Sequence, residues 1–149
     1  MAGFRTILVP TDFSGHSGAA IDAAVELAKA FGGKIRLLHC YALNPGGVSP
    51  YGVVIPPNFD REVREAAARQ LDELRDKTAA RGVEVEATLS SMFPSQEIVR
   101  TAEEIGADVI VMGTRGLTGV KHVLLGSVTE RTVRMANCPV LTVKADDEG

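Results

Sequence analysis

The sequence is poor in the features that mark secreted, metal-binding and membrane proteins. Its 149 residues include two cysteines, Cys40 and Cys138, and three histidines that share no metal-ligand spacing. A disulfide-stapled fold and a histidine zinc site are therefore not expected. No run of apolar residues is longer than four, so no segment should span a membrane. The first ten residues lack a charged region followed by a long apolar stretch, so we expect no signal peptide and a cytoplasmic location.

The chain also lacks an excess of charge of one sign. It carries 16 Lys and Arg against 19 Asp and Glu, and three of the acidic residues lie among the last four. The rest is balanced, without the basic excess that nucleic acid or an anionic membrane attracts, so we expect neither as a partner. Apolar residues make up 45% and charged residues 23%, as in an average globular protein. A length of 149 residues predicts one domain, spanning 1–149.

Short apolar runs alternate along the chain with longer helical patterns. The runs, which predict strands, are 6–10, 35–41, 83–87, 109–112 and 140–143. Apolar residues at helical spacing predict helices over 17–31, 59–78 and 94–105, with a short helix beginning at 127. This βαβαβαβαβ order predicts an α/β fold, a single doubly wound sheet of five parallel strands with helices on both faces.

The polarity of each run predicts its place in the sheet. Runs 6–10 and 109–112 are almost wholly apolar, as in strands buried on both faces, and should be central. Run 83–87 alternates apolar with charged residues and should lie near an edge. These places fit the strand order 3-2-1-4-5, although 2-1-3-4-5 is also common. In the first order, a ligand should bind between strands one and four, beside Thr11-Asp12 and Gly113.

The segment from Gly113 to Ser127 has the composition of a phosphate-binding loop. It contains two basic residues and no carboxylate. Glycine at a strand end lets a ligand approach the backbone, and Gly116 would permit a left-handed turn. Gly126-Ser127 opens a helix whose N–H groups and dipole favour an anion. A plain surface loop is the other interpretation, in which Ser127 to Glu130 form a capping box that stabilises the helix without any ligand.

These segments resemble the universal stress protein family. The spacing Gly113-x2-Gly116-x9-Gly126-Ser127 reproduces that family's nucleotide-binding motif, and Ile7 to Ser14, Gly106 to Gly113 and Cys138 to Val143 resemble its first, fourth and last strands with their flanking residues. The resemblance covers essentially the whole chain except the loop 44–57. It implies that the chain binds ATP, with Mg²⁺ or Mn²⁺ on the phosphates.

The resemblance also implies a role for each part of this site. The glycines of the loop would admit the ribose and phosphates, and the start of the last helix would hold the terminal phosphates. Asp12 would face the ribose or a phosphate-bound Mg²⁺, and Cys40 stands where the family usually has a valine beside the adenine. We expect valine at Gly116 or Gly126 to abolish binding, both by blocking phosphate and by resisting the backbone angles there. The implied nucleotide-binding residues are Pro10, Thr11, Asp12, Cys40, Met112, Gly113, Arg115, Gly116, Gly126, Ser127, Val128 and Thr129.

Other catalytic motifs are missing or incomplete. The sequence has no Gly-x4-Gly-Lys-Ser/Thr and no Gly-x-Gly-x-x-Gly after the first strand. Gly15 to Gly18 is one residue short of a Gly-x-Ser-x-Gly nucleophile elbow, so we interpret Ser17 as a helix cap. Asp12 is the one evident base, so we expect ATP hydrolysis to be slow at most. The resemblance accordingly implies a regulatory nucleotide-binding module.

Two other functions are kept as alternatives. An adenylating ATPase of related fold would carry Ser-Gly-Gly-x-Asp-Ser after the first strand, where this chain has 12–17, Asp-Phe-Ser-Gly-His-Ser. A dimer without nucleotide would act through protein contacts alone, and the intact glycines count against it.

The last strand, Pro139 to Val143, predicts a homodimer. It lies at an edge in the order 3-2-1-4-5 and carries no charge, whereas edges that face water normally carry charge or a cover. Antiparallel pairing with the same strand of a second copy would cover it, and many universal stress proteins dimerise in this way. Cys40 and Cys138 would lie about three strand spacings apart, too far for a disulfide.

Overall fold

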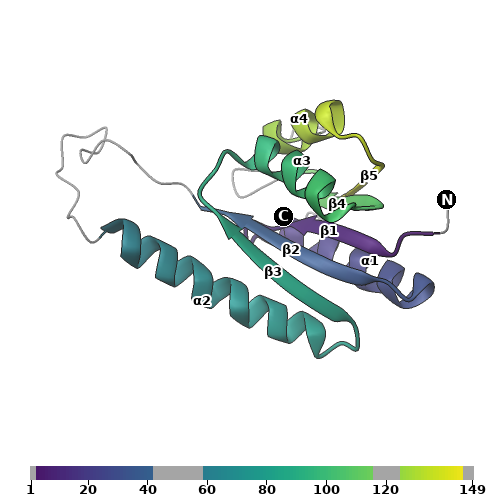
Figure 1. The fold of residues 1–149 in the computed structure, drawn as a ribbon, viewed down its shortest axis with the longest axis horizontal. Helices are drawn as coiled ribbons and strands as arrows, with labels where there is room; N and C mark the ends of the chain where they lie inside the picture. Colours follow the sequence, from purple (N-terminus) through teal and green to yellow (C-terminus); the bar gives the residue numbers. More distant parts are fainter. Residues whose placement is uncertain (1–2, 42–58, 116–124, 146–149) are drawn as a thin grey trace.

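The computed structural model describes residues 3–41, 59–115 and 125–145 (Figure 1). The predicted loop 44–57 and Gly116 lie outside these described residues. Within them, strands and helices alternate in the predicted order. They are β1 (Thr6–Pro10), α1 (Gly15–Phe31), β2 (Lys34–Cys40), α2 (Phe59–Ala79), β3 (Glu84–Ser90), α3 (Pro94–Ile105), β4 (Val109–Gly113), α4 (Ser127–Met135) and β5 (Val140–Val143).

The five strands form one parallel sheet in the order β3-β2-β1-β4-β5, which confirms the prediction. The two apolar strands, β1 and β4, are neighbours inside the sheet, and the half-polar β3 is at an edge. Ile7 pairs with Ile35 on one side and with Val109 on the other. At the amino ends of these strands, Asp108 Oδ2 accepts the backbone N–H groups of Arg5 and Thr6 at 3.0 and 2.9 Å.

The alternation of side chains along β1 divides the core between the two faces of the sheet. Ile7 and Val9 pack in one cluster with the apolar stripe of α1 and with Leu71 of α2. Leu8 points to the opposite face and packs in a second cluster with Ile98 of α3. Figure 1 accordingly shows α3 and α4 on one side of the sheet and α2 on the other. The three central side chains of β1, Ile7, Leu8 and Val9, are fully buried, as expected of a strand covered on both faces.

Two boundaries differ from the predictions by more than one residue. The third strand continues to Ser90, because its ladder with β2 runs on to the pair Cys40–Ser90 after the alternating pattern has ended. The first helix starts at Gly15, and Ser14 is its cap, so the assignment of the cap to Ser17 was wrong. The Ser14 side chain accepts the Ser17 N–H at 3.3 Å, which satisfies one of the unpaired donors of the first turn.

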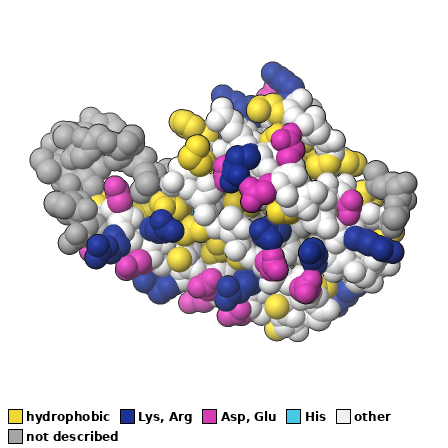
Figure 2. Space-filling model, in the orientation of Figure 1, with side chains coloured by type: hydrophobic (Ala, Val, Ile, Leu, Met, Phe, Trp, Pro, Cys, Tyr) yellow, Lys and Arg dark blue, Asp and Glu magenta, His cyan; other side chains and the backbone are white. Residues whose placement is uncertain are grey.

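Positive and negative side chains are interspersed along α2 and α3 on the face shown in Figure 2. Among the described residues, no helix is both long and apolar enough to cross a membrane. Cys40 and Cys138 are not joined in a disulfide, as predicted.

Candidate functional site

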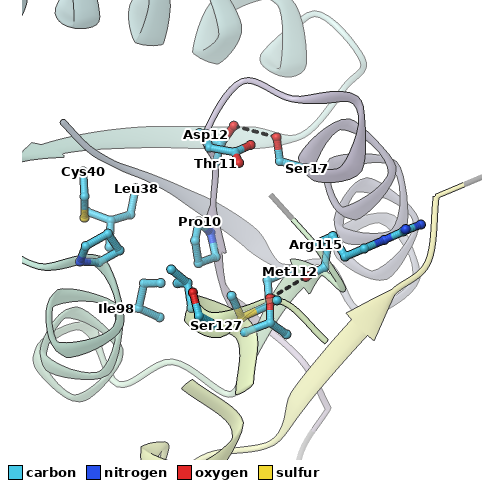
Figure 3. A pocket seen from close by; sticks show the side chains of 15 residues that line it. Pro10, Thr11, Asp12, Ser17, Leu38, Cys40, Ile98, Met112, Arg115 and Ser127 are labelled. Carbon is cyan, nitrogen blue, oxygen red and sulfur yellow. Dashed lines mark hydrogen bonds between the residues drawn. The ribbon is translucent and has the colours of Figure 1, made fainter. Parts of the chain in front are cut away.

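A cleft of about 220 Å³ opens at the carboxyl ends of β1 and β4, where the strand order predicted a ligand site (Figure 3). It brings together all the predicted site residues that the structure describes, and Gly116 lies outside the described part of the chain. The predicted residues that line the cleft are Pro10, Thr11, Asp12, Cys40, Met112, Gly113, Arg115, Gly126, Ser127, Val128 and Thr129.

Four further lining residues were not among the predicted ones. They are Ser17, Leu38, Pro94 and Ile98. Pro94 opens α3 four residues after the last residue of β3, near the carboxyl edge of the sheet, and Ile98 follows one helical turn later on the same face. The helical pattern that begins at Pro94 was therefore the signal in the sequence that could have identified Pro94 and Ile98 as lining residues.

One end of the cleft is apolar. Leu38 and Ile98 are almost completely buried, and they lie beside Pro10, Cys40 and Met112 in Figure 3. Burial raises the pKa of the Cys40 thiol to about 11, and the nearby negative charge of Glu97 adds to this. The thiol is therefore neutral near pH 7 and acts as part of an apolar wall.

Glu97 of α3 is itself buried, only 3% exposed, and it is not among the residues that line the cleft. Arg100 Nε donates to its carboxylate at 3.0 Å, and a second bond from the same guanidinium makes the contact bidentate. Hydrogen bonds from Arg100 lower the pKa of Glu97, burial opposes this, and the charge of Arg100 and a hydrogen bond with Ser90 lower it further. Glu97 is thus an ionised group whose partner comes from its own helix.

The other end of the cleft is the start of α4. Gly126 is the N-cap, and among the described residues no side chain caps the helix. Ser127 is already the first helical residue, so the capping box of the alternative interpretation, Ser127 to Glu130, is absent. The Gly126 N–H donates to the Thr114 carbonyl at 2.6 Å, and the Thr129 hydroxyl donates to the Gly113 carbonyl at 2.8 Å. The first turn of α4 therefore presents backbone donors and a positive dipole end to the cleft.

The two described glycines of the motif have different roles. A Cβ on Gly113 would lie 2.7 Å from the carbonyl oxygen of His16, so this glycine lets the first turn of α1 pack against the end of β4. Gly126 has φ −68° and ψ 165°, an extended conformation open to any residue. The expectation that its backbone angles would resist valine was therefore wrong. Close approach of a ligand to the backbone is then the remaining reason why a glycine would be needed at position 126.

The loop after β1 forms a third side of the cleft. Thr11 is buried, and its hydroxyl accepts the Phe13 N–H at 3.0 Å and is hydrogen-bonded to the Ser17 hydroxyl at 3.0 Å. The Ser17 hydroxyl in turn donates to the Ser14 carbonyl at 2.9 Å. Asp12 Oδ1 accepts the Ser14 N–H at 3.0 Å, which holds the carboxylate at the edge of the cleft (Figure 3).

Arg115 lines the cleft, yet its charged end is directed elsewhere. The residue is 6% exposed, and Figure 3 shows its side chain extending away from the other labelled side chains. In this conformation the backbone and stem of Arg115, and not its guanidinium, contribute to the cleft.

The sequence of this chain is similar to known proteins along nearly its whole length. The model of the universal stress protein family matches residues 3–144. Universal stress protein YxiE of Bacillus subtilis is 35% identical over 147 residues, which cover 95% of this chain and 99% of that protein. Universal stress protein MJ0531 of Methanocaldococcus jannaschii is 36% identical, over 95% of this chain and 82% of its own length.

Solved structures share the fold along almost the entire chain. Protein MJ0577 of Methanocaldococcus jannaschii superposes with a TM-score of 0.83 at 29% identity, covering 97% of this chain and 99% of that one. A universal stress protein in complex with cAMP superposes with a TM-score of 0.70 at 27% identity, with the same two coverages.

Proposed function

The chain belongs to the universal stress protein family, and we propose that it is a one-domain cytoplasmic regulatory module that binds ATP in the cleft between β1 and β4. The division of the cleft carries this proposal. One end is apolar, at Leu38, Cys40 and Ile98, and the other is the uncapped start of α4. A nucleotide is divided in the same way, into a flat base and charged phosphates. The solved relative in complex with cAMP supports an adenine nucleotide as the ligand class.

In the proposed complex the phosphates lie at the first turn of α4, where Ser127 and Val128 provide donors. Among the described residues no group of three His, Cys, Asp or Glu side chains could hold a metal by itself. Mg²⁺ or Mn²⁺ would therefore be held by Asp12 together with phosphate oxygens, in keeping with the preference of hard cations for oxygen ligands. The metal would neutralise phosphate charge there.

We propose that any hydrolysis is slow. Asp12 is the one carboxylate among the described residues that line the cleft, and Oδ1 of that side chain already accepts the Ser14 N–H. A water molecule attacking the γ-phosphate needs a group that orients it. A carboxylate already engaged in positioning the loop and the metal is poorly suited to that second task. The bound nucleotide would then act as a long-lived state of the module.

The test begins with the nucleotide that accompanies the purified protein. We expect denaturation to release an adenine nucleotide that chromatography identifies, and calorimetry to show binding of Mg·ATP to the emptied protein. Asp12→Asn should weaken binding in the presence of Mg²⁺ by about tenfold and much less in EDTA. Asp60→Asn on the exposed surface of α2 is the control and should leave binding unchanged. An empty extract with no Mg·ATP binding would exclude the proposal.

We further propose that β5 forms a homodimer with its copy. Pro139 and Val143 carbonyls accept N–H groups of Ile110 and Thr114, so by alternation the N–H of Thr142 faces outward. Leu141 of β5 and Val133 and Met135 of α4 are exposed apolar side chains, 41%, 45% and 45%. An outward row of donors beside exposed apolar side chains fits a second copy of the strand.

Thr142→Pro tests the dimer because it removes an outward donor and spares the ladder to β4. We expect light scattering to give a dimer for the wild type at tens of micromolar and a folded monomer for this variant. Leu141→Pro removes instead an N–H that faces β4, so it should lower the thermal stability, which Thr142→Pro should not. A wild type that is monomeric at this concentration would contradict the proposal.

A further inference from the structure

Phe13 has an unusual backbone conformation for its residue type. Its φ is +66°, and among the described residues it is the one residue other than glycine with a positive φ. The other described positions with positive φ are all glycines: Gly3, Gly32, Gly82 and Gly106. A side chain with a Cβ is disfavoured in this region, and for a bulky residue it is a genuine outlier. The surroundings of Phe13 must therefore stabilise the conformation.

The Phe13 ring is in contact with His39 of β2. The rings of Phe13 and His39 stack with their centroids 4.2 Å apart and their planes tilted by 40°. His39 Nδ1 lies 2.8 Å from the carbonyl oxygen of Thr11. Because a carbonyl only accepts, Nδ1 carries the proton and donates it. One histidine thus contacts the residue before Asp12 and the residue after it.

Thr11 is also fixed by bonds on its other polar atoms. Its N–H donates to the Leu38 carbonyl at 2.9 Å, and its hydroxyl accepts the Phe13 N–H at 3.0 Å. Thr11 is therefore hydrogen-bonded directly to β2. Phe13 is hydrogen-bonded to Thr11, and its ring contacts His39 of β2. Neither Phe13 nor His39 lines the cleft itself, whereas Asp12 does.

We propose that Phe13 and His39 form a latch that fixes residues 11–14 in the conformation in which Asp12 reaches the cleft, and that they are positioning residues for the Mg-nucleotide. The assignment to a nucleotide rests on the proposed function. A loop fixed in advance loses little conformational freedom when ligand binds, so affinity gains from contacts made elsewhere. The strained conformation of Phe13 makes the ring contact with His39 necessary, because without it the loop would relax.

A double-mutant cycle tests whether the latch acts through Asp12. Phe13→Ala should weaken Mg·ATP binding by about tenfold in the wild-type background and by less than about twofold when Asp12→Asn is already present. Phe13→Tyr keeps the ring and should bind within about twofold of wild type. Phe31→Ala is the control, because it removes a comparable ring contact, 5.7 Å to Phe4, outside the cleft lining, and should leave affinity unchanged. Equal losses in both backgrounds, or no loss, would overturn the proposal.

His39 can be separated into its ring and its donor. His39→Phe keeps the stacking and removes the bond to Thr11, whereas His39→Asn keeps an N–H donor and removes the stacking. We expect each to lose part of the affinity that Phe13→Ala loses, and both losses to shrink in the Asp12→Asn background. A full wild-type affinity in both variants would show that His39 positions nothing.

Amide hydrogen exchange tests the latch without any ligand. In Phe13→Ala we expect the Ser14 amide to exchange about tenfold faster than in wild type, because its bond to Asp12 opens with the loop, while the amides of Ile7 and Leu8 are unchanged. If the wild type binds no nucleotide yet exchange accelerates as expected, the latch stands and the proposed function falls. Unchanged exchange at Ser14 would overturn the latch even if the nucleotide binds.

Discussion

Two segments meet at the cleft, and they are held there in different ways. After β1, the loop 11–14 uses its own polar side chains, since Thr11, Asp12 and Ser14 each accept a backbone N–H within it or next to it. At the start of α4, no described side chain caps the helix, and Gly126 is anchored through its backbone to the Thr114 carbonyl. The first segment satisfies its own hydrogen bonds, whereas the second directs donors toward the cleft.

This difference separates the sources of stability from the sources of binding. Changes in the loop and its packing should alter how well the protein folds, because contacts within the chain are lost, and they should alter affinity only through Asp12. Changes at the first turn of α4 should alter ligand affinity and leave stability nearly the same. Substitutions at matched residue types in the two segments can test that separation.

The largest expected effect is the loss of nucleotide binding in Gly126→Val. The backbone at Gly126 accepts any residue, so we expect an unchanged melting temperature, whereas the branched side chain should block the phosphates and lower affinity by about 100-fold or more. Calorimetry with Mg·ATP and thermal unfolding measure the two quantities. Gly15→Val is the control, because a Cβ there meets open space. Wild-type affinity in Gly126→Val would exclude phosphate from this turn.

Gly113→Ala should show the opposite pattern. Its Cβ would approach the His16 carbonyl oxygen to 2.7 Å, which is backbone and cannot rotate away. We expect a loss of about 1 to 3 kcal/mol in the free energy of unfolding, the cost of overpacking. Chemical denaturation measures it, and Gly18→Ala, with open space around its Cβ, should instead stabilise α1 by about 0.5 to 1 kcal/mol. A stable Gly113→Ala protein that fails to bind would assign this glycine to the ligand.

A pair of serines gives the smallest and most direct comparison. Ser14→Ala removes the N-cap of α1 and should cost about 1 kcal/mol in the free energy of unfolding. Ser127→Ala removes no cap, so its stability should stay within about 0.5 kcal/mol of wild type. Equal losses in urea titrations of the two variants would mean that Ser127 caps α4 in solution.

Hydrophobic patterning was sufficient to predict the sheet. The almost wholly apolar runs at 6–10 and 109–112 favoured places in the middle, the charged alternation at 83–87 favoured an edge, and the strand order confirms both. The end of β3 was missed because residues 88–90 are included by pairing with β2, which local pattern does not record. Long, regular patterns predict that a strand or helix is present, whereas its last residues depend on the neighbouring strand or helix with which they pair or pack.

The candidate site was harder to predict, since it depends on single backbone angles. The glycine spacing predicted which segments meet, and the cleft brings those residues together. The sequence could not show that Gly126 and not Ser127 is the cap, because both interpretations fit the same letters. The backbone conformation of Phe13 was not predicted, because nothing in the sequence Asp-Phe-Ser indicates a left-handed residue. Such details follow from tertiary contacts, here those with His39.

The place of β1 in the middle of the sheet has a consequence for how the chain folds during its synthesis. The strand leaves the ribosome well before its neighbour β4, because Asp108, which holds its amino end, follows Thr6 by 102 residues. At a synthesis rate of about 5 to 20 residues per second, roughly 5 to 20 seconds pass between them. Once β2 has been made it can pair with β1 on one side, while the other side of this almost wholly apolar strand still has no neighbour from its own chain. The nascent protein is therefore exposed to wrong strand pairing for seconds before β4 is made.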